Sequence, residues 1–67
     1  MAMLKVIEVL AQSTKSWEDA AQVAVANASK SVRNIKSIYI KNMEASVSNG
    51  KIENYRMNAK ISFVIDD

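Results

Sequence analysis

The sequence contains no cysteine, no histidine, no proline and a single glycine. Without cysteine the 67-residue chain has no disulfides, and without histidine it also lacks the other usual ligand of zinc, copper and iron sites. Small domains usually gain stability from disulfides, a structural metal or partner subunits. Partner subunits therefore remain as the source of stability, unless the chain has an unusually good small core.

The same two absences argue against an enzyme. Histidine is the usual general base near neutral pH, and cysteine is the strongest ready nucleophile. No pattern in the sequence places a serine, lysine or tyrosine nucleophile beside a base. We therefore expect a protein that is not an enzyme.

Long apolar runs are also missing. The longest run covers residues 23–26, far below the roughly 20 residues of a membrane span. Lys5 and Glu8 interrupt any apolar region of a signal peptide. Apolar residues make up 49% and charged residues 24% of the chain, which is the balance of a globular protein. We expect one domain over residues 1–67, no membrane partner, and the cytoplasm as the default location.

The net charge is +2, which is too small to indicate nucleic-acid binding. Its distribution is uneven, because residues 20–43 contain no acid and four cations: Lys30, Arg33, Lys36 and Lys41. This basic stretch is consistent with phosphate binding, but we prefer a helix C-terminus followed by a solvated strand. No RNA-binding strand motif or recognition-helix pattern is present, so nucleic acid is not expected as a partner.

The first half of the chain predicts a strand and a helix. Residues 3–10 are rich in β-branched residues. Both the odd-numbered and the even-numbered positions are largely apolar, which predicts a strand covered on both faces. A polar loop is expected at residues 12–15. Ser16 is the predicted N-cap of the helix, and Asp19 completes a variant capping box.

The predicted helix carries a stripe of mostly small apolar residues. Its members recur at helical spacing: Trp17, Ala21, Ala24, Ala28 and Val32. We expect Trp17 to serve packing, and the small residues to let the helix lie close to its neighbours. The helix is expected to end near Arg33 and Asn34, with Lys30 and Arg33 in its last turn, where cations suit the helix dipole.

The second half predicts a long hairpin. Residues 35–47 have the alternating pattern of a strand. The alternation of apolar residues changes phase by one residue near Lys41 and Asn42, which predicts a β-bulge there. Asn49 and Gly50 predict a type I′ turn. The last strand alternates most regularly, so we expect it at the centre of the sheet. Its apolar face consists of Tyr55, Met57, Ala59, Ile61, Phe63 and Ile65.

The expected fold is therefore α+β, with the order β-α-β-β and one three-stranded antiparallel sheet. The hairpin arms would extend about 45 Å, whereas a helix of about 17 residues extends about 25 Å. One helix cannot cover the apolar side chains of so long a hairpin, and exposed apolar bands mark interfaces. The length mismatch predicts a homo-oligomer.

This order of motifs resembles the dodecin family over almost the whole chain. The resemblance rests on four segments: Lys5-Val6-Ile7-Glu8; Ser16-Trp17-Glu18-Asp19-Ala20-Ala21; Ala28-Ser29-Lys30-Ser31-Val32-Arg33-Asn34-Ile35; and Tyr55 with Phe63. It implies a sheet that wraps its helix and a hollow homododecamer. It also implies riboflavin, FMN or FAD bound between subunits, for storage or sequestration.

The positions that contact flavin in this family are changed. Ser37 stands where flavin-binding members have a tryptophan that stacks on the ring, and Arg56 stands where they have a glutamine at the pyrimidine edge. Arginine offers only hydrogen-bond donors, whereas glutamine offers a donor and an acceptor. Tyr39, two residues from Ser37, is a candidate substitute ring.

A subset of dodecins lacks the stacking tryptophan and carries a Tyr-Arg pair, as Tyr55 and Arg56 do here, and a calcium-binding role is attached to one such member. Calcium requires six to eight oxygens. The acids of this chain lack EF-hand spacing: Glu8, Glu18, Asp19, Glu44, Glu53, Asp66 and Asp67. Copies of one acid around a symmetry axis would supply the oxygens, and Glu44 is the candidate. The sequence thus leaves a flavin-binding shell and an ion-binding or purely structural shell as alternatives.

Overall fold

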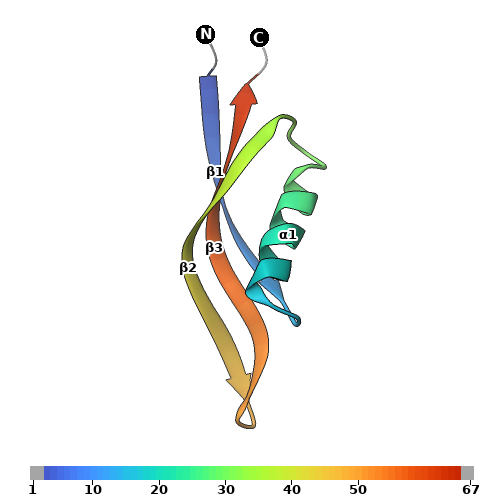
Figure 1. The fold of residues 1–67 in the computed structure, drawn as a ribbon, viewed down its shortest axis with the longest axis vertical. Coiled ribbons are helices and arrows are strands. Elements are labelled where there is room, and N and C mark those ends of the chain that lie inside the picture. The colour runs from blue at the N-terminus through green and yellow to red at the C-terminus, as the bar shows by residue number, and fades with distance from the viewer. Residues whose placement is uncertain (1–2, 66–67) are drawn as a thin grey trace.

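The computed structural model describes residues 3–65. The elements are β1 (Met3–Ser13), α1 (Trp17–Ala28), β2 (Ile35–Ser48) and β3 (Lys51–Ile65). All three strands form one antiparallel sheet in the order β1-β3-β2, and α1 lies along one side of it (Figure 1). The predicted β-α-β-β order and the central position of the last strand are confirmed.

The connection from β1 to α1 is shorter than predicted. Gln12 and Ser13 belong to β1, because they pair with Arg56 and Tyr55 of β3. The predicted loop at residues 12–15 was therefore wrong in its first half. A strand continues where its backbone has a partner, even when its side chains are polar.

The helix begins as predicted. Ser16 is the N-cap, and its hydroxyl accepts a hydrogen bond from the Asp19 amide at 2.9 Å. The Asp19 carboxylate does not reach back to Ser16; it accepts from the Ser13 hydroxyl, with 2.6 Å between Ser13 Oγ and Asp19 Oδ2. Asp19 therefore fastens the first turn of α1 to the end of β1.

The predicted end of the helix was wrong. α1 stops at Ala28, so Lys30 and Arg33 lie beyond its last turn. The Ser29 hydroxyl donates to the Val25 carbonyl at 2.8 Å, and residues 29–31 continue as turns. Asn34 then adopts a φ of 62°, a left-handed conformation that asparagine tolerates better than most residues. The chain leaves the helix early because it has to turn back toward β2.

The hairpin of β2 and β3 agrees with the sequence pattern. Asn49 and Gly50 have φ values of 53° and 74°, as a type I′ turn requires at both central positions. The predicted bulge appears as a register shift between Ile40 and Asn42. Two further shifts, near Ile35 and near Ser46, were not predicted.

The core lies between α1 and one face of the sheet. It is small: among residues 3–65, Met57 and Ile61 are the only large side chains that are fully buried. The other buried apolar residues are Ala20, Ala24, Ala59 and Phe63. Because the helix presents alanines, its backbone lies close to the sheet, as the stripe of small residues predicted.

The subunit is long and thin. Its extents are 52 × 20 × 13 Å, and its radius of gyration of 13.7 Å exceeds the roughly 11 Å of a compact chain of this length. β1 and β3 extend past the helix at one end, and the β2–β3 hairpin extends past it at the other (Figure 1). Large apolar side chains are exposed at both ends, including Met3, Leu4, Val47 and Ile52. No helix within residues 3–65 is long and apolar enough to cross a membrane.

Candidate functional site

The two faces of the sheet differ in what covers them. α1 packs on the face that carries Val9, Ala11, Ile38, Met57 and Ala59. The opposite face has no cover in the single chain, so the helix covers only one of the two apolar faces predicted for β1, and the apolar side chains of that face are at most partly buried. We call this second surface the open face. It consists of Leu4, Val6, Glu8, Leu10 and Gln12 from β1, Arg56, Asn58, Lys60, Ser62 and Val64 from β3, and Ser37, Tyr39, Asn42 and Glu44 from β2.

All four residues singled out from the sequence lie on the open face. Ser37 is paired with Ser62 of β3, and the two hydroxyls are hydrogen-bonded. Tyr39 is paired with Lys60 and is 65% exposed. A hydroxyl pair therefore occupies the position at which the resemblance led us to expect a stacking tryptophan in flavin-binding members, and an exposed aromatic ring lies two residues away.

Arg56 and Glu44 are brought together, which the sequence reading did not foresee. They are partners across β3 and β2, and Gln12 of β1 is opposite Arg56 on the other side. Arg56 Nη1 lies 3.4 Å from Glu44 Oε1, and Arg56 Nε donates to Gln12 Oε1 at 3.2 Å. A polar row of three side chains thus crosses the whole sheet.

A cavity lies beside this row. Its volume is about 280 Å³, and it is lined by Leu10, Asn42, Met43, Glu44, Met57 and Asn58. Leu10, Asn58 and Asn42 form the next row of the open face. The register shift after Ile40 immediately precedes this row, and bulges commonly occur beside functional sites.

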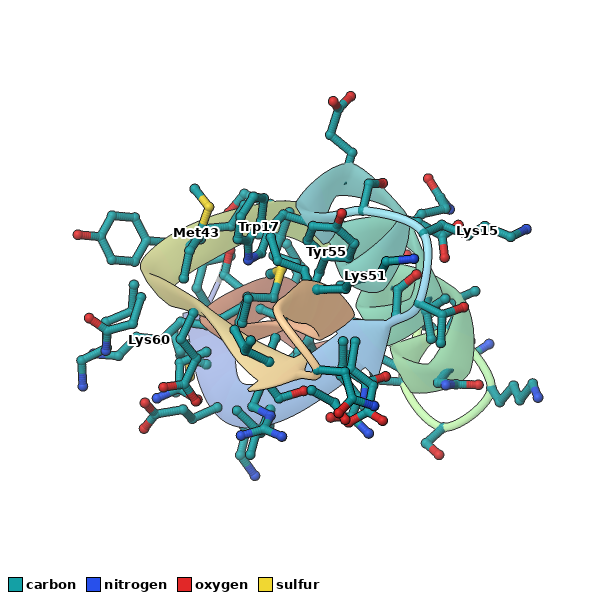
Figure 2. The ribbon with its side chains drawn as sticks, turned by 90° about the horizontal axis from the view of Figure 1, so that it is seen from below. Lys15, Trp17, Met43, Lys51, Tyr55 and Lys60 are labelled. Atoms are coloured by element: carbon teal, nitrogen blue, oxygen red, sulfur yellow. The ribbon has the colours of Figure 1, made fainter. Side chains whose placement is uncertain are left out.

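Trp17 reaches the same place from the other side of the sheet. Its indole Nε1 donates to the backbone carbonyl of Glu44 at 3.0 Å. Its ring meets the ring of Tyr55 edge-on, with 4.8 Å between centroids and an interplanar angle of 79°. Figure 2 shows these two rings next to each other on the helix side, near Met43. Trp17 packs between helix and sheet, as expected, and also holds the backbone at Glu44.

The charges around Tyr39 form a second polar group. Glu8 and Lys41 form an ion pair at 3.5 Å, and Lys60 lies between the strands that carry Glu8 and Tyr39. The basic stretch is therefore divided. Lys41 is paired with Glu8 across the open face, and Lys30, Arg33 and Lys36 lie around the connection from α1 to β2.

One subunit does not complete either candidate site. Ser37 is paired with Ser62, which lies six residues from Arg56 along β3. This separation is roughly 20 Å, longer than the three-ring system of a flavin. For calcium, no group of three acids within residues 3–65 is close enough to share an ion. Asp66 and Asp67 lie outside the described residues. A second copy of the chain would have to supply the missing contacts in both cases.

Apolar grooves flank the helix as well. A groove of about 500 Å³ runs between α1 and β1, and its apolar lining includes Ile7, Val9, Val23, Ala24 and Val32. A smaller groove of about 280 Å³ lies between α1 and β2. No motif predicts these grooves directly; they form because a short helix with small side chains packs on a longer sheet.

The fold and the sequence were compared with known proteins. A family model described as Dodecin matches residues 3–66. An arginine-to-alanine variant of the Thermus thermophilus dodecin superposes with a TM-score of 0.95, at 21% identity over 100% of both chains. Dodecin from Streptomyces davaonensis gives 0.93 at 17% identity, over 98% of this chain and 97% of that one.

A further structure is more similar in sequence. Calcium dodecin from Mycobacterium tuberculosis, a calcium-chelating immunodominant antigen with a novel calcium-binding site, is 35% identical over 96% of this chain and 91% of its own. Its TM-score is 0.82. No curated protein matches the sequence at a significant level. The family match over nearly the whole chain, together with the shared β-α-β-β fold, shows that the protein belongs to the dodecin family.

Proposed function

We propose that the protein is the subunit of a homododecameric shell that binds a small ligand between subunits and does not act as an enzyme. The observation that carries this proposal is the uncovered open face, which gathers Ser37, Tyr39, Arg56 and Glu44 on a subunit with a very small core. Ligand contacts there are incomplete in one chain. A second copy completes the site and also covers the exposed apolar side chains.

Surface area supports the assembly. The subunit exposes 4987 Å², whereas a compact monomer of 7.4 kDa exposes about 4200 Å². The excess of about 800 Å² equals what one partner buries in a standard protein interface. The apolar grooves beside α1 and the exposed side chains at both ends of the sheet offer the surfaces for such contacts.

Flavin is the first candidate ligand, and the role of the protein would then be to store or sequester it. Tyr39 offers an exposed ring, and Arg56 offers donors to ring carbonyls. The missing tryptophan removes a stacking contact of roughly 1–3 kcal/mol, which corresponds to about one to two decades in affinity. We therefore expect weak flavin binding, riboflavin and FMN included.

Calcium is the second candidate, favoured by the 35% identity to calcium dodecin and by Ser37 in the stacking position. Glu44 is the residue proposed to bind it, with its carboxylate repeated by symmetry-related copies. Arg56 opposes this role in the single chain, because its guanidinium lies 3.4 Å from the same carboxylate. Calcium would have to displace Arg56 to bind.

The test combines mass and binding. Sedimentation of the purified protein should give a mass of twelve subunits, and a stable monomer would refute the assembly. Quenching of riboflavin fluorescence measures the affinity for riboflavin. The wild type should bind riboflavin weakly, and Ser37→Trp should bind it about ten- to a hundredfold more tightly. Thr14→Trp, on the exposed connection before α1, is the matched control and should leave riboflavin binding unchanged. A Ser37→Trp variant that assembles but does not quench riboflavin contradicts the flavin proposal.

Calcium is tested by calorimetry on the assembled protein. Glu44→Gln should abolish calcium binding, while Glu53→Gln, an exposed acid near the hairpin turn, should leave it intact. Equal calcium binding by wild type and Glu44→Gln would show that Glu44 is not the ligand.

A further inference from the structure

The ion pair between Arg56 and Glu44 is loose. A single N–O contact of 3.4 Å joins the two groups, and the side chains are 35% and 64% exposed respectively. Arginine–carboxylate pairs of the strong kind are bidentate and shorter, and exposed pairs contribute no more than about 1 kcal/mol. Glu44 is therefore a partner that Arg56 can exchange at little cost.

Arg56 keeps its position when Glu44 leaves. Its Nε is held by Gln12 from the opposite strand at 3.2 Å, so the guanidinium has a second anchor that does not depend on the carboxylate. These two contacts use two of the five N–H donors of the guanidinium. The remaining donors, together with the positive charge, form an oriented receptor for an anion.

Room for a ligand group lies beside Glu44, the partner of Arg56. Glu44 lines the cavity of about 280 Å³, whose other lining residues include Asn42, Asn58 and the apolar Leu10 from the next row of the open face. Amides donate to oxyanions without adding charge. A phosphate monoester carries a charge of about −1.5 to −2 at neutral pH, against −1 for a carboxylate, and therefore competes well for a guanidinium.

We propose that Arg56 binds the phosphate group of a small-molecule ligand and that Glu44 is an internal competitor for the same guanidinium. The ligand displaces Glu44, and a cation bound to Glu44 assists the displacement, so that phosphate and cation strengthen each other's binding. This inference rests on the proposed function in placing the ligand on the open face. It adds a preference for phosphorylated ligands and a built-in regulator of their affinity.

FMN and riboflavin form a matched pair of probes, because they differ by one phosphate group. Glu44→Gln should tighten FMN binding by no more than about fivefold, the affinity equivalent of an exposed ion pair, and leave riboflavin unchanged. Arg56→Gln also changes the contact with the flavin ring, so the measured quantity is the ratio of FMN to riboflavin affinity. This ratio should fall to about one in Arg56→Gln, and Arg56→Lys should keep part of it. Calcium chloride should tighten FMN binding in the wild type but not in Glu44→Gln, while Glu53→Gln behaves as wild type.

Inorganic phosphate tests the site even if the protein binds no flavin. Trp17 is the sole tryptophan and donates to the Glu44 carbonyl, so its emission reports movement at Glu44. Phosphate should produce a saturable change in the wild type, relative to a chloride control of equal ionic strength. The change should need less phosphate in Glu44→Gln, more phosphate in Arg56→Lys, and should be absent in Arg56→Gln. The inference would be overturned if the wild type and both Arg56 variants responded to phosphate alike while their assemblies kept the normal mass. If Ser37→Trp did not quench riboflavin fluorescence, only the flavin proposal would be overturned.

Discussion

The two faces of the sheet are built from alternate residues of the same strand and differ in almost every property. On β3, Met57, Ala59, Ile61 and Phe63 face the helix and are buried. The residues between them are polar and at least partly exposed: Arg56, Asn58, Lys60 and Ser62. One strand therefore supplies the core on one side and the candidate ligand contacts on the other.

This division means that substitutions one residue apart on β3 should affect different measurements. Changes on the helix side should reduce the stability of the subunit, because the core is too small to compensate. Changes on the open face should alter binding or assembly and leave the fold intact. The four predictions that follow test how strictly the two faces are separated.

The largest effect is expected at Ile61. Ile61→Ala removes a fully buried side chain and should lower the free energy of unfolding by about 2–5 kcal/mol. The neighbouring change Lys60→Ala, on the open face, should stay within about 0.5 kcal/mol. Urea unfolding at one fixed protein concentration measures both, since the stability of an oligomer depends on concentration. Similar losses for the two variants would show that the faces are not separate.

Trp17→Phe should have the next largest effect. It keeps an aromatic ring against Tyr55 but removes the indole N–H that donates to the Glu44 carbonyl at 3.0 Å. We expect a loss of about 0.5–1.5 kcal/mol in thermal or urea unfolding, the usual net contribution of one hydrogen bond, because the bond is exposed and water can replace the indole N–H. The same variant should alter ligand binding at Arg56 if the backbone at Glu44 transmits changes between the faces, and unaltered binding would mean that it does not.

Ser16→Ala should cost about 1 kcal/mol. The change removes the hydroxyl that accepts from the Asp19 amide at the start of α1. Ser16→Asp keeps an accepting side chain and is the control, expected to unfold close to the wild type. Stability equal to wild type in Ser16→Ala would show that the link between Ser13 and Asp19 fixes the helix start alone.

Glu44→Gln should have the smallest effect on stability. Its ion pair with Arg56 is exposed, so we expect a change below about 1 kcal/mol, reduced further by added salt. Glu8→Gln, which removes the other ion pair of the open face, should behave in the same way. A loss of several kcal/mol in Glu44→Gln would mean that this face also stabilises the subunit.

Local patterns predicted most of the fold. Ser16 as N-cap, the Asn49-Gly50 turn and the bulge before Asn42 each depend on a few neighbouring residues, and each is present. The end of α1 at Ala28 was missed because helix-compatible residues continue to Arg33. What stops the helix is the return of the chain to β2, which is a tertiary requirement.

The candidate site was predicted one residue at a time and not as a group. A two-residue turn at Asn49 and Gly50, followed by perfect pairing, places Glu44 opposite Tyr55 on the helix side. The register shift near Ser46 moves Glu44 opposite Arg56 and onto the open face. Nothing in the sequence marked that shift, so the Arg56–Glu44 pair required the structure.

The pairing of β1 with β3 has a consequence for synthesis and folding. It runs from Met3↔Ile65 to Ser13↔Tyr55, so the strand made first pairs with the strand made last. The β2–β3 hairpin can close locally, whereas β1 waits until β3 has been made, and such distant pairings slow folding. Until β3 leaves the ribosome, β1 is an apolar strand without a partner, exposed to aggregation. The order of the strands therefore makes the fifteen residues of β3 decisive for whether a nascent chain reaches its native sheet.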